Sequence, residues 1–490
     1  MRRILGIALV VLGAGTVTAV GQEASKPGEL RLLPCQRTDV APPAKCGTFT
    51  VWENRDGKTG RAIDLSVVVL EATGPDPLPD PYVFLLGGPG QAATSIARAL
   101  NDAAERERRD ILLVDQRGTG ESNGLLCGPE RAAPLQAFMA TMDARRVQAC
   151  RNELEKRADL RYYLTPYAMD DLDDLRVALG YERINLDGGS YGTRAALVYI
   201  RRHGQHVRTA RLDGALAFGY RIPIGFAADA EASLRNVLAD CAAEPECAAA
   251  FPTLADDYRR AFHALESEGP LALRVRDPRT GDSVDVTFSA ADFAESLRAM
   301  LYAPEPTRRI PAILHHAATT GDYRPFVDFQ LNRNLGLTEG IAEGMYFAIT
   351  CTEDVARLDA AAIEASGRGT FLAQHRTRPH VQGCEGWPPG RLPPGYHEEV
   401  ASDVPVLIMT GSNDPATPPA SAHAAASRLS NARVIIVPGG GHGFGGLAGA
   451  ECLQAIGARF LETADPRTLD TSCVANVHRK PFVLSVEPAR

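Results

Sequence analysis

A serine, an aspartate and a histidine carry the clearest chemical signal in the sequence. Ser190 lies in Gly-Gly-Ser-Tyr-Gly at 188–192, which matches the pattern Gly-x-Ser-x-Gly. The strand-like segment 184–186 precedes this motif and a helical pattern over 191–202 follows it, so Ser190 stands at a strand-to-helix turn. Such a turn requires small neighbours because its backbone is crowded, and it lifts the hydroxyl off the sheet. We therefore predict that Ser190 is a nucleophile.

A nucleophilic serine needs a base that takes its proton and an acid that orients the base. Asp414 follows the strand-like segment 404–409, and His442 follows the strand-like segment 433–437. Each of these residues alone could simply belong to a turn or loop. Their order after the serine and their places at strand ends together predict a Ser-His-Asp triad, because sites of open parallel sheets form at the carboxyl ends of the strands.

Acyl transfer also needs donors for the oxyanion of the tetrahedral intermediate. The run Leu-Gly-Gly-Pro-Gly at 86–90 follows an apolar strand and precedes an alanine-rich stretch. Pro89 has no N–H, so we predict that the backbone N–H groups of Gly88 and Tyr191 form the oxyanion hole. The alternative for the glycine run is a purely structural turn.

Short apolar runs alternate with helical patterns on both sides of these motifs, which predicts an α/β fold with a mostly parallel sheet. The expected strands are 62–70, 82–86, 111–114, 183–186, 209–212, 404–409 and 433–437, and the expected helices are 91–109, 167–179, 191–202, 420–429 and 449–464. Between 222 and 400 the pattern changes to alanine-rich helical segments with many prolines, and 284–288 could be a short strand. We interpret 222–400 as a mainly helical cap inserted between late strands, with the core made of 22–221 and 401–490.

Composition and the N-terminus indicate the compartment. The 490 residues contain 60 acidic and 52 basic side chains, a net charge of −8, so nucleic acid is not an expected partner. Two arginines precede an apolar stretch over 4–20 that glycines and threonines dilute. We predict a signal peptide at 1–21 rather than the alternative, an uncleaved anchor, and no stable membrane insertion. The mature protein is then exported, to the periplasm or the medium.

The ten cysteines fit export, because an oxidising compartment favours disulfides. No Cys-x-x-Cys is present, and no metal site or cofactor motif is visible. Nearest-neighbour pairing is one of many possible connectivities, and ten free thiols are the alternative. Nearest-neighbour pairing would join Cys35 with Cys46, Cys127 with Cys150, Cys241 with Cys247, Cys351 with Cys384, and Cys452 with Cys473.

With these residues assembled, the chain resembles the α/β-hydrolase superfamily, and more narrowly the secreted serine peptidases of the proline iminopeptidase and tripeptidyl aminopeptidase (TAP-like) group. The motifs that carry the resemblance span most of the chain and lie at 87–90, 115–120, 188–193, 411–418 and 441–443. Leu86 is a departure, because many iminopeptidases have histidine there. By this resemblance, Asp115 and Arg117 brace the loop beside the nucleophile. Glu353, and after it Asp354, would hold the free amino group of the substrate.

The combined expectation is an exported serine hydrolase that releases amino-terminal residues or short peptides from oligopeptides through an acyl-enzyme. A carboxylesterase acting on small esters is the alternative, since fold and triad do not choose between amide and ester. A non-catalytic binding protein is the third hypothesis, and the complete triad argues against it.

Overall fold

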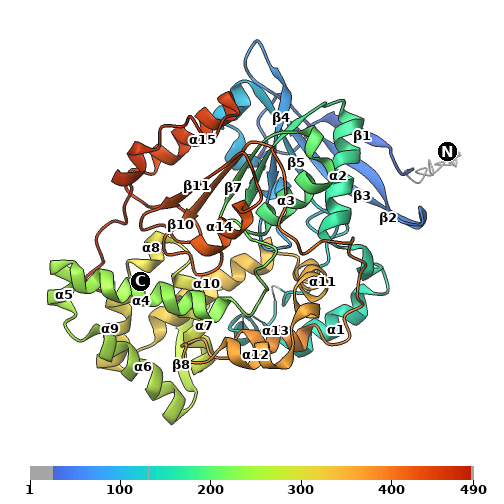
Figure 1. Cartoon of the computed structure of the whole chain (residues 1–490). Helices are drawn as coiled ribbons and strands as arrows, with labels where there is room; N and C mark the ends of the chain where they lie inside the picture. Colours follow the sequence, from blue (N-terminus) through green and yellow to red (C-terminus); the bar gives the residue numbers. More distant parts are fainter. Residues whose placement is uncertain (1–25, 131, 141, 487–490) are drawn as a thin grey trace, which may run out of the picture.

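The computed structural model describes residues 26–130, 132–140 and 142–486. The predicted signal peptide, 1–21, lies outside these residues. A nine-stranded sheet occupies the upper half of the molecule in Figure 1, in the order β1-β2-β3-β5-β4-β6-β7-β10-β11. The strands are β1 (Leu30–Pro34), β2 (Ala44–Asn54), β3 (Thr59–Leu70), β4 (Leu78–Leu85), β5 (Arg109–Val114), β6 (Ile184–Gly189), β7 (Val207–Asp213), β10 (Val406–Gly411) and β11 (Ala432–Val437).

The first three strands pair antiparallel and the last six are parallel. The central strands are short apolar runs, such as Ile111 to Leu113 in β5, because helices bury both of their faces. Helices α2 (Thr165–Leu179) and α3 (Tyr191–His203) share a core with one face. The other face packs against η1 (Ala93–Leu100) and α15 (Glu451–Thr463). The predicted mostly parallel α/β sheet is confirmed.

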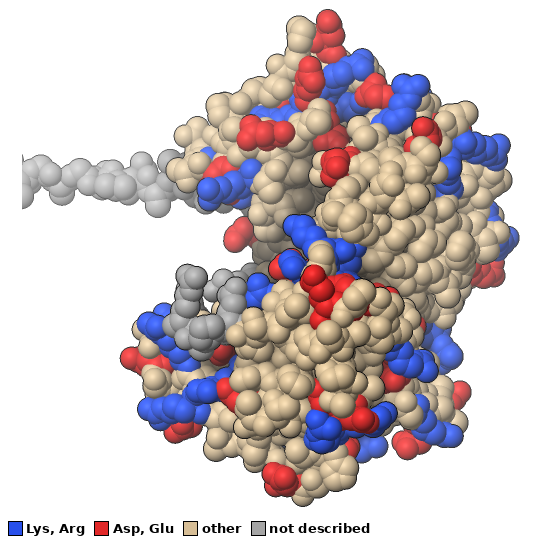
Figure 2. Space-filling model, turned by 90° about the vertical axis from the view of Figure 1, so that its left-hand side faces the viewer, with Lys and Arg blue, Asp and Glu red and all other residues tan. Residues whose placement is uncertain are grey.

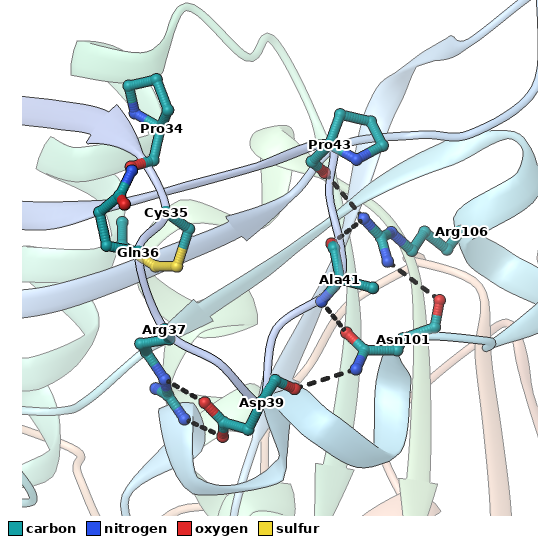
Figure 3. Close-up of a disulfide and its surroundings, with 10 residues drawn as sticks. Pro34, Cys35, Gln36, Arg37, Asp39, Ala41, Pro43, Asn101 and Arg106 are labelled. Carbon is teal, nitrogen blue, oxygen red and sulfur yellow. Dashed lines mark hydrogen bonds and ion pairs between the residues drawn. A yellow bond between two sulfur atoms is a disulfide. The ribbon is translucent and has the colours of Figure 1, made fainter.

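The crossover before β5 differs from the prediction. Instead of an α-helix over 91–109, the chain forms two 3-10 helices, η1 and η2 (Ala104–Glu107). Arg106 in η2 is buried, and its guanidinium ties this segment to the chain before β2 (Figure 3). It donates to the carbonyl oxygens of Ala41, Pro43, Glu71 and Asn101. These four bonds to irregular backbone fix η2 locally, which helical propensity alone does not reveal.

The segment between β7 and β10 is mainly helical, as predicted, and lies below the sheet in Figure 1; it is called the helical insertion here. Its α-helices are α4 (Phe226–Ala243), α5 (Pro245–Ala250), α6 (Leu254–Glu268), α7 (Ala290–Met300), α8 (Pro304–Thr307), α9 (Ile310–Thr320), α10 (Arg324–Gly340), α11 (Glu343–Glu353), α12 (Ala360–Ser366) and α13 (Thr377–Gly383). A hairpin of β8 (Leu271–Arg276) and β9 (Ser283–Phe288) interrupts them, so the short strand expected at 284–288 is confirmed.

The helical insertion has two parts with different cores. Helices α4 to α10 surround an apolar cluster of their own that includes Phe288, Phe293 and Phe326. Helix α11 instead contributes Met345 and Phe347 to the core beneath the sheet. Helix α1 (Ala144–Leu154) lies against both α11 and α13. The helical insertion is therefore anchored to the sheet at α11, close to the edge where the strands end.

All ten cysteines form disulfides, and the nearest-neighbour pairing is confirmed. The bonds are Cys35–Cys46, Cys127–Cys150, Cys241–Cys247, Cys351–Cys384 and Cys452–Cys473. The first of them lies beside the Arg37–Asp39 ion pair in the segment that Arg106 fastens (Figure 3). Five disulfides indicate an oxidising, extracytoplasmic location.

On the face drawn in Figure 2, acidic and basic side chains are intermingled over most of the surface. The surface is hollowed where the sheet half, above, meets the helical insertion, below, and both basic and acidic side chains lie at the edge of this hollow. Within the described part of the chain, no helix combines the length and the apolar character needed to cross a membrane.

Candidate active site

The nucleophile turn has the strained backbone that the motif requires. Ser190, between β6 and α3, has φ 56° and ψ −123°, an uncommon conformation for a residue with a side chain. A Cβ on Gly192 would lie 1.8 Å from the carbonyl oxygen of Leu85, and one on Gly188 would lie 2.6 Å from that of Gly192. Both motif glycines are therefore needed for packing. The sharp turn places Ser190 at the start of a helix and at the wall of a cavity.

Asp414 and His442 meet at the ends of neighbouring parallel strands, β10 and β11. Nδ1 of His442 lies 2.9 and 3.0 Å from the two carboxylate oxygens of Asp414. The carboxylate is buried and also accepts hydrogen bonds from the backbone N–H groups of Ala416 and Thr417, at 2.8 and 2.9 Å. These bonds hold the acid in place, so that it can orient the imidazole.

A residue of the helical insertion also holds the histidine. The backbone N–H of His442 donates to the carbonyl oxygen of Tyr302 at 2.7 Å, and the two rings meet edge to face with centroids 5.1 Å apart. Sequence reasoning missed Tyr302, because nothing in its local pattern links it to a loop 140 positions later. The contact joins the insertion directly to the histidine of the predicted triad.

The surroundings of His442 favour its charged form. Burial lowers the pKa of the imidazole, but the charge of Asp414 and the hydrogen bond to it outweigh burial and raise the pKa to about 9. The same interaction stabilises the imidazolium that forms when the histidine accepts a proton from the serine.

The predicted oxyanion donors border the same cavity as the serine. A Cβ on Gly87 would lie 3.0 Å from the Cβ of Ser190, so the glycine loop is in direct contact with Ser190. Gly88 and Tyr191 both line the cavity. Neither of their backbone N–H groups donates to another of the described residues. They are thus available to bind a developing negative charge, as an oxyanion hole requires.

The cavity has a volume of about 350 Å³. Ser190 and His442 lie on its core side, and side chains of the helical insertion and of the chain before α1 form much of the remaining wall. These include Phe138, Phe226, Arg298, Tyr302, Arg333, Ile341, Glu343 and Arg376. In the described part of the chain, no group of three or more His, Cys, Asp or Glu side chains is arranged to hold a metal.

Glu353 and Asp354 are not among the residues that line this cavity, so their placement does not support the predicted contact with the substrate. Glu353 is fully buried and accepts hydrogen bonds from the backbone and hydroxyl of Thr165 at 2.8 and 3.0 Å and from the Tyr396 hydroxyl. Asp354, also fully buried, forms an ion pair with Arg194 at 2.8 Å. Both carboxylates are occupied by internal partners that link α11 to the core.

Asp115 and Arg117 also have internal partners, and their expected role in bracing the loop beside Ser190 stays a prediction. Asp115 accepts hydrogen bonds from the backbone and hydroxyl of Thr94 at 2.8 and 3.0 Å. Arg117 is fully buried and pairs with Asp171 at 2.7 Å. Of the described residues, the carboxylate that does line the cavity is Glu343, which sequence reasoning missed.

This fold, with a strained serine at the strand-to-helix turn and an Asp-His pair at two later strand ends, defines a serine hydrolase of the α/β-hydrolase class. Comparison with known families agrees. Residues 81–285 match the alpha/beta hydrolase fold family, and residues 370–473 match the TAP-like protein family. The chain is therefore an α/β-hydrolase with a TAP-like segment towards its C-terminus.

Among characterised proteins, the chain is similar to the serine protease Hip1 of Mycobacterium tuberculosis, with 25% identity over 84% of this chain and 85% of that protein. It is 30% identical to the tripeptidyl aminopeptidase of Streptomyces lividans over 35% of each chain. It is 28% identical to the proline iminopeptidase of Xylella fastidiosa, over 27% of this chain and 32% of that one. The relatives place the chain among serine hydrolases and peptidases.

Proposed function

We propose that the protein is an exported serine aminopeptidase that releases amino-terminal residues or short peptides from oligopeptides. The observation that carries this proposal is the cavity around Ser190, whose 350 Å³ and walls of insertion side chains suit a short peptide rather than a folded protein. The names of two relatives, a tripeptidyl aminopeptidase and a proline iminopeptidase, support the same class of reaction. The five disulfides support a location in the periplasm or the medium.

In the proposed reaction, Oγ of Ser190 attacks the scissile carbonyl carbon while His442 accepts the hydroxyl proton. Asp414 fixes the tautomer of His442 and stabilises its charged form. The N–H groups of Gly88 and Tyr191 bind the oxyanion. The tetrahedral intermediate then expels the amine, which receives the proton from His442. A water molecule, deprotonated by the same histidine, hydrolyses the acyl-enzyme and restores the serine.

Glu343 replaces Glu353 as the candidate for binding the amino group of the substrate. It lines the cavity, where a carboxylate can bind an ammonium group through charge-assisted hydrogen bonds. Arg146 holds the Glu343 side chain with two hydrogen bonds. Nη1 donates to Oε2, and Nη2 donates to Oε1 at 3.1 Å. We expect Glu343→Gln to raise KM for peptides with a free amino terminus and to leave simple esters almost unaffected. The matched control is Glu353→Gln.

A substrate panel tests the proposed function. It contains aminoacyl, prolyl and tripeptidyl chromogenic amides, the same amides with an acetylated amino terminus, and short esters, each assayed with the wild type and with Ser190→Ala. Hydrolysis of free amides well above their acetylated forms is expected. Equal hydrolysis of the acetylated forms would refute the aminopeptidase, and turnover of esters alone would establish the carboxylesterase alternative. A fluorophosphonate probe that fails to label Ser190 would exclude both.

A further inference from the structure

Three arginines of the helical insertion line the catalytic cavity: Arg298 of α7, Arg333 of α10 and Arg376, the residue before α13. Among the described residues, one carboxylate faces this group. Oε2 of Glu295 lies 3.5 Å from Nε of Arg298 and 3.6 Å from Nη1 of Arg376, and Glu295 itself is not part of the cavity wall. Three positive charges therefore share one negative charge.

Arg333 has no carboxylate within ion-pair distance among the described residues. Its Nη1 donates to the side chain of Asn334 at 3.1 Å, and its guanidinium lies 5.9 Å from the ring centroid of Tyr302. Burial, together with the like charges of Arg298 and Arg376, lowers the pKa of Arg333 to about 10. At physiological pH the side chain is nevertheless charged. A positive group is thus held near two others at the wall of the cavity.

Arg376 has unused hydrogen-bonding capacity. Its side chain borders the cavity and the residue is 9% exposed. Among the described residues, Nε has no hydrogen-bond partner, and Nη1 has only the ion-pair contact with Glu295 at 3.6 Å, which is too long for a hydrogen bond. The remaining arginine of the described lining, Arg146, forms an ion pair with Glu343. Leaving buried guanidinium donors unpaired costs free energy, and the planar fork of arginine matches a carboxylate in a bidentate way.

We propose that Arg298, Arg333 and Arg376 form an anion subsite that binds a carboxylate of the substrate. The inference rests on the proposed reaction at Ser190 and names the substrate class, a short peptide with a carboxylate near the scissile bond. The subsite is close to the triad. Arg298 donates to the Tyr302 hydroxyl at 2.7 Å, and the Tyr302 ring contacts His442. The carboxylate has two possible sources: an acidic side chain on the acylating residue or the C-terminus of a short leaving peptide.

Two matched substrate pairs test the proposal and separate the sources. The first pair consists of chromogenic peptide amides with glutamate or glutamine as the acylating residue. The second consists of short peptides with a free or an amidated C-terminus. A charge-assisted pair predicts a preference of about tenfold to a hundredfold in kcat/KM for the charged member of one pair. Equal kcat/KM within both pairs would overturn the subsite.

The variant Arg333→Gln tests the residue itself. We expect Arg333→Gln to reduce the kcat/KM preference for the charged substrate at least about tenfold. Arg333→Lys should restore part of the preference, because it returns the positive charge without the planar guanidinium. Arg324→Gln is the matched control. Arg324 is an exposed arginine of the same helix, and it pairs with Asp322 outside the cavity. A preference that survives Arg333→Gln would overturn the assignment.

Calorimetric titration with glutarate gives a readout that does not depend on turnover. We expect the wild type and Arg324→Gln to bind this dicarboxylate equally, and Arg333→Gln to bind it at least about tenfold more weakly. If Ser190 neither reacts with a fluorophosphonate nor turns over any substrate, the proposed reaction fails, and the titration alone then decides the subsite. Absence of glutarate binding to the wild type would overturn it.

Discussion

Raising the pH should activate this enzyme, because the ion pair with Asp414 raises the pKa of His442 to about 9. The base must be neutral to accept the serine proton. At pH 7, two pH units below that pKa, only about 1% of the imidazole is neutral. We therefore expect kcat/KM to rise about tenfold per pH unit through neutral pH and to level off above pH 9.

The same ion pair has the opposite effect on stability. The folded pKa of His442 lies above its ordinary value of 6.5, so its contribution to stability is complete below pH 6.5 and disappears as the pH rises through 9. The difference corresponds to about 3 kcal/mol at 1.36 kcal/mol per pKa unit. This is an upper bound, because the His442 side chain is 14% exposed and solvent weakens the interaction.

Both effects are measured between pH 6 and 10.5. The rate of Ser190 labelling by a fluorophosphonate and the hydrolysis of a neutral ester report the activity, and urea unfolding with the disulfides intact reports the stability. Asp414→Asn should slow the reaction by several orders of magnitude and move the acid limb below pH 6.5, because the Asp414 charge no longer offsets burial and the positive charge of Arg298, which both lower the pKa of His442. Asp285→Asn, in the exposed β8–β9 hairpin, is the control. A wild-type acid limb at or below pH 6.5 would refute the reasoning.

Three further changes test the frame around the site. Gly192→Ala should abolish Ser190 labelling, because its Cβ would lie 1.8 Å from the Leu85 carbonyl oxygen; an active, labelled variant would contradict this packing. Glu353→Gln should lower the unfolding free energy by about 1 to 3 kcal/mol and leave KM unchanged, whereas a raised KM would return this residue to the substrate site. Removing Cys127 and Cys150 together should cost about 3 kcal/mol and raise KM more than it lowers kcat, since their loop carries Phe138 of the cavity wall; unaltered kinetics would count against that coupling.

The parts of the site that belong to the sheet could be predicted from the sequence. Ser190, Asp414 and His442 each lie in the turn or loop that follows a strand-like run, and parallel strands that end at one edge bring such residues together. The expected helix before β5 was wrong in type, because three of the four carbonyl oxygens bound by Arg106 come from segments distant in the sequence. Local patterns carry no information about such contacts.

Residues from the insertion could not be predicted in the same way. An acidic pair after a cysteine has the same sequence pattern whether it faces substrate or the protein interior, so Glu353 was placed at the substrate by resemblance alone. Arg298, Arg333 and Arg376 belong to different helical segments whose relative placement depends on the packing of an apolar core. Each has the pattern of an ordinary surface arginine, and only the fold shows that they share one wall and one counter-charge.

The division between sheet and insertion explains how one chain can combine common chemistry with particular specificity. The triad needs only strand ends and tight glycine turns, which the sheet supplies whatever covers it. The insertion supplies the walls, and its Tyr302 links the arginine group to His442 through a hydroxyl at one end and a ring and carbonyl at the other. A carboxylate bound by the arginines would add negative charge near the imidazole and favour its protonated form. We therefore expect glutarate to shift the acid limb of fluorophosphonate labelling to higher pH in the wild type and not in Arg333→Gln, and an identical limb with and without glutarate would disprove this link.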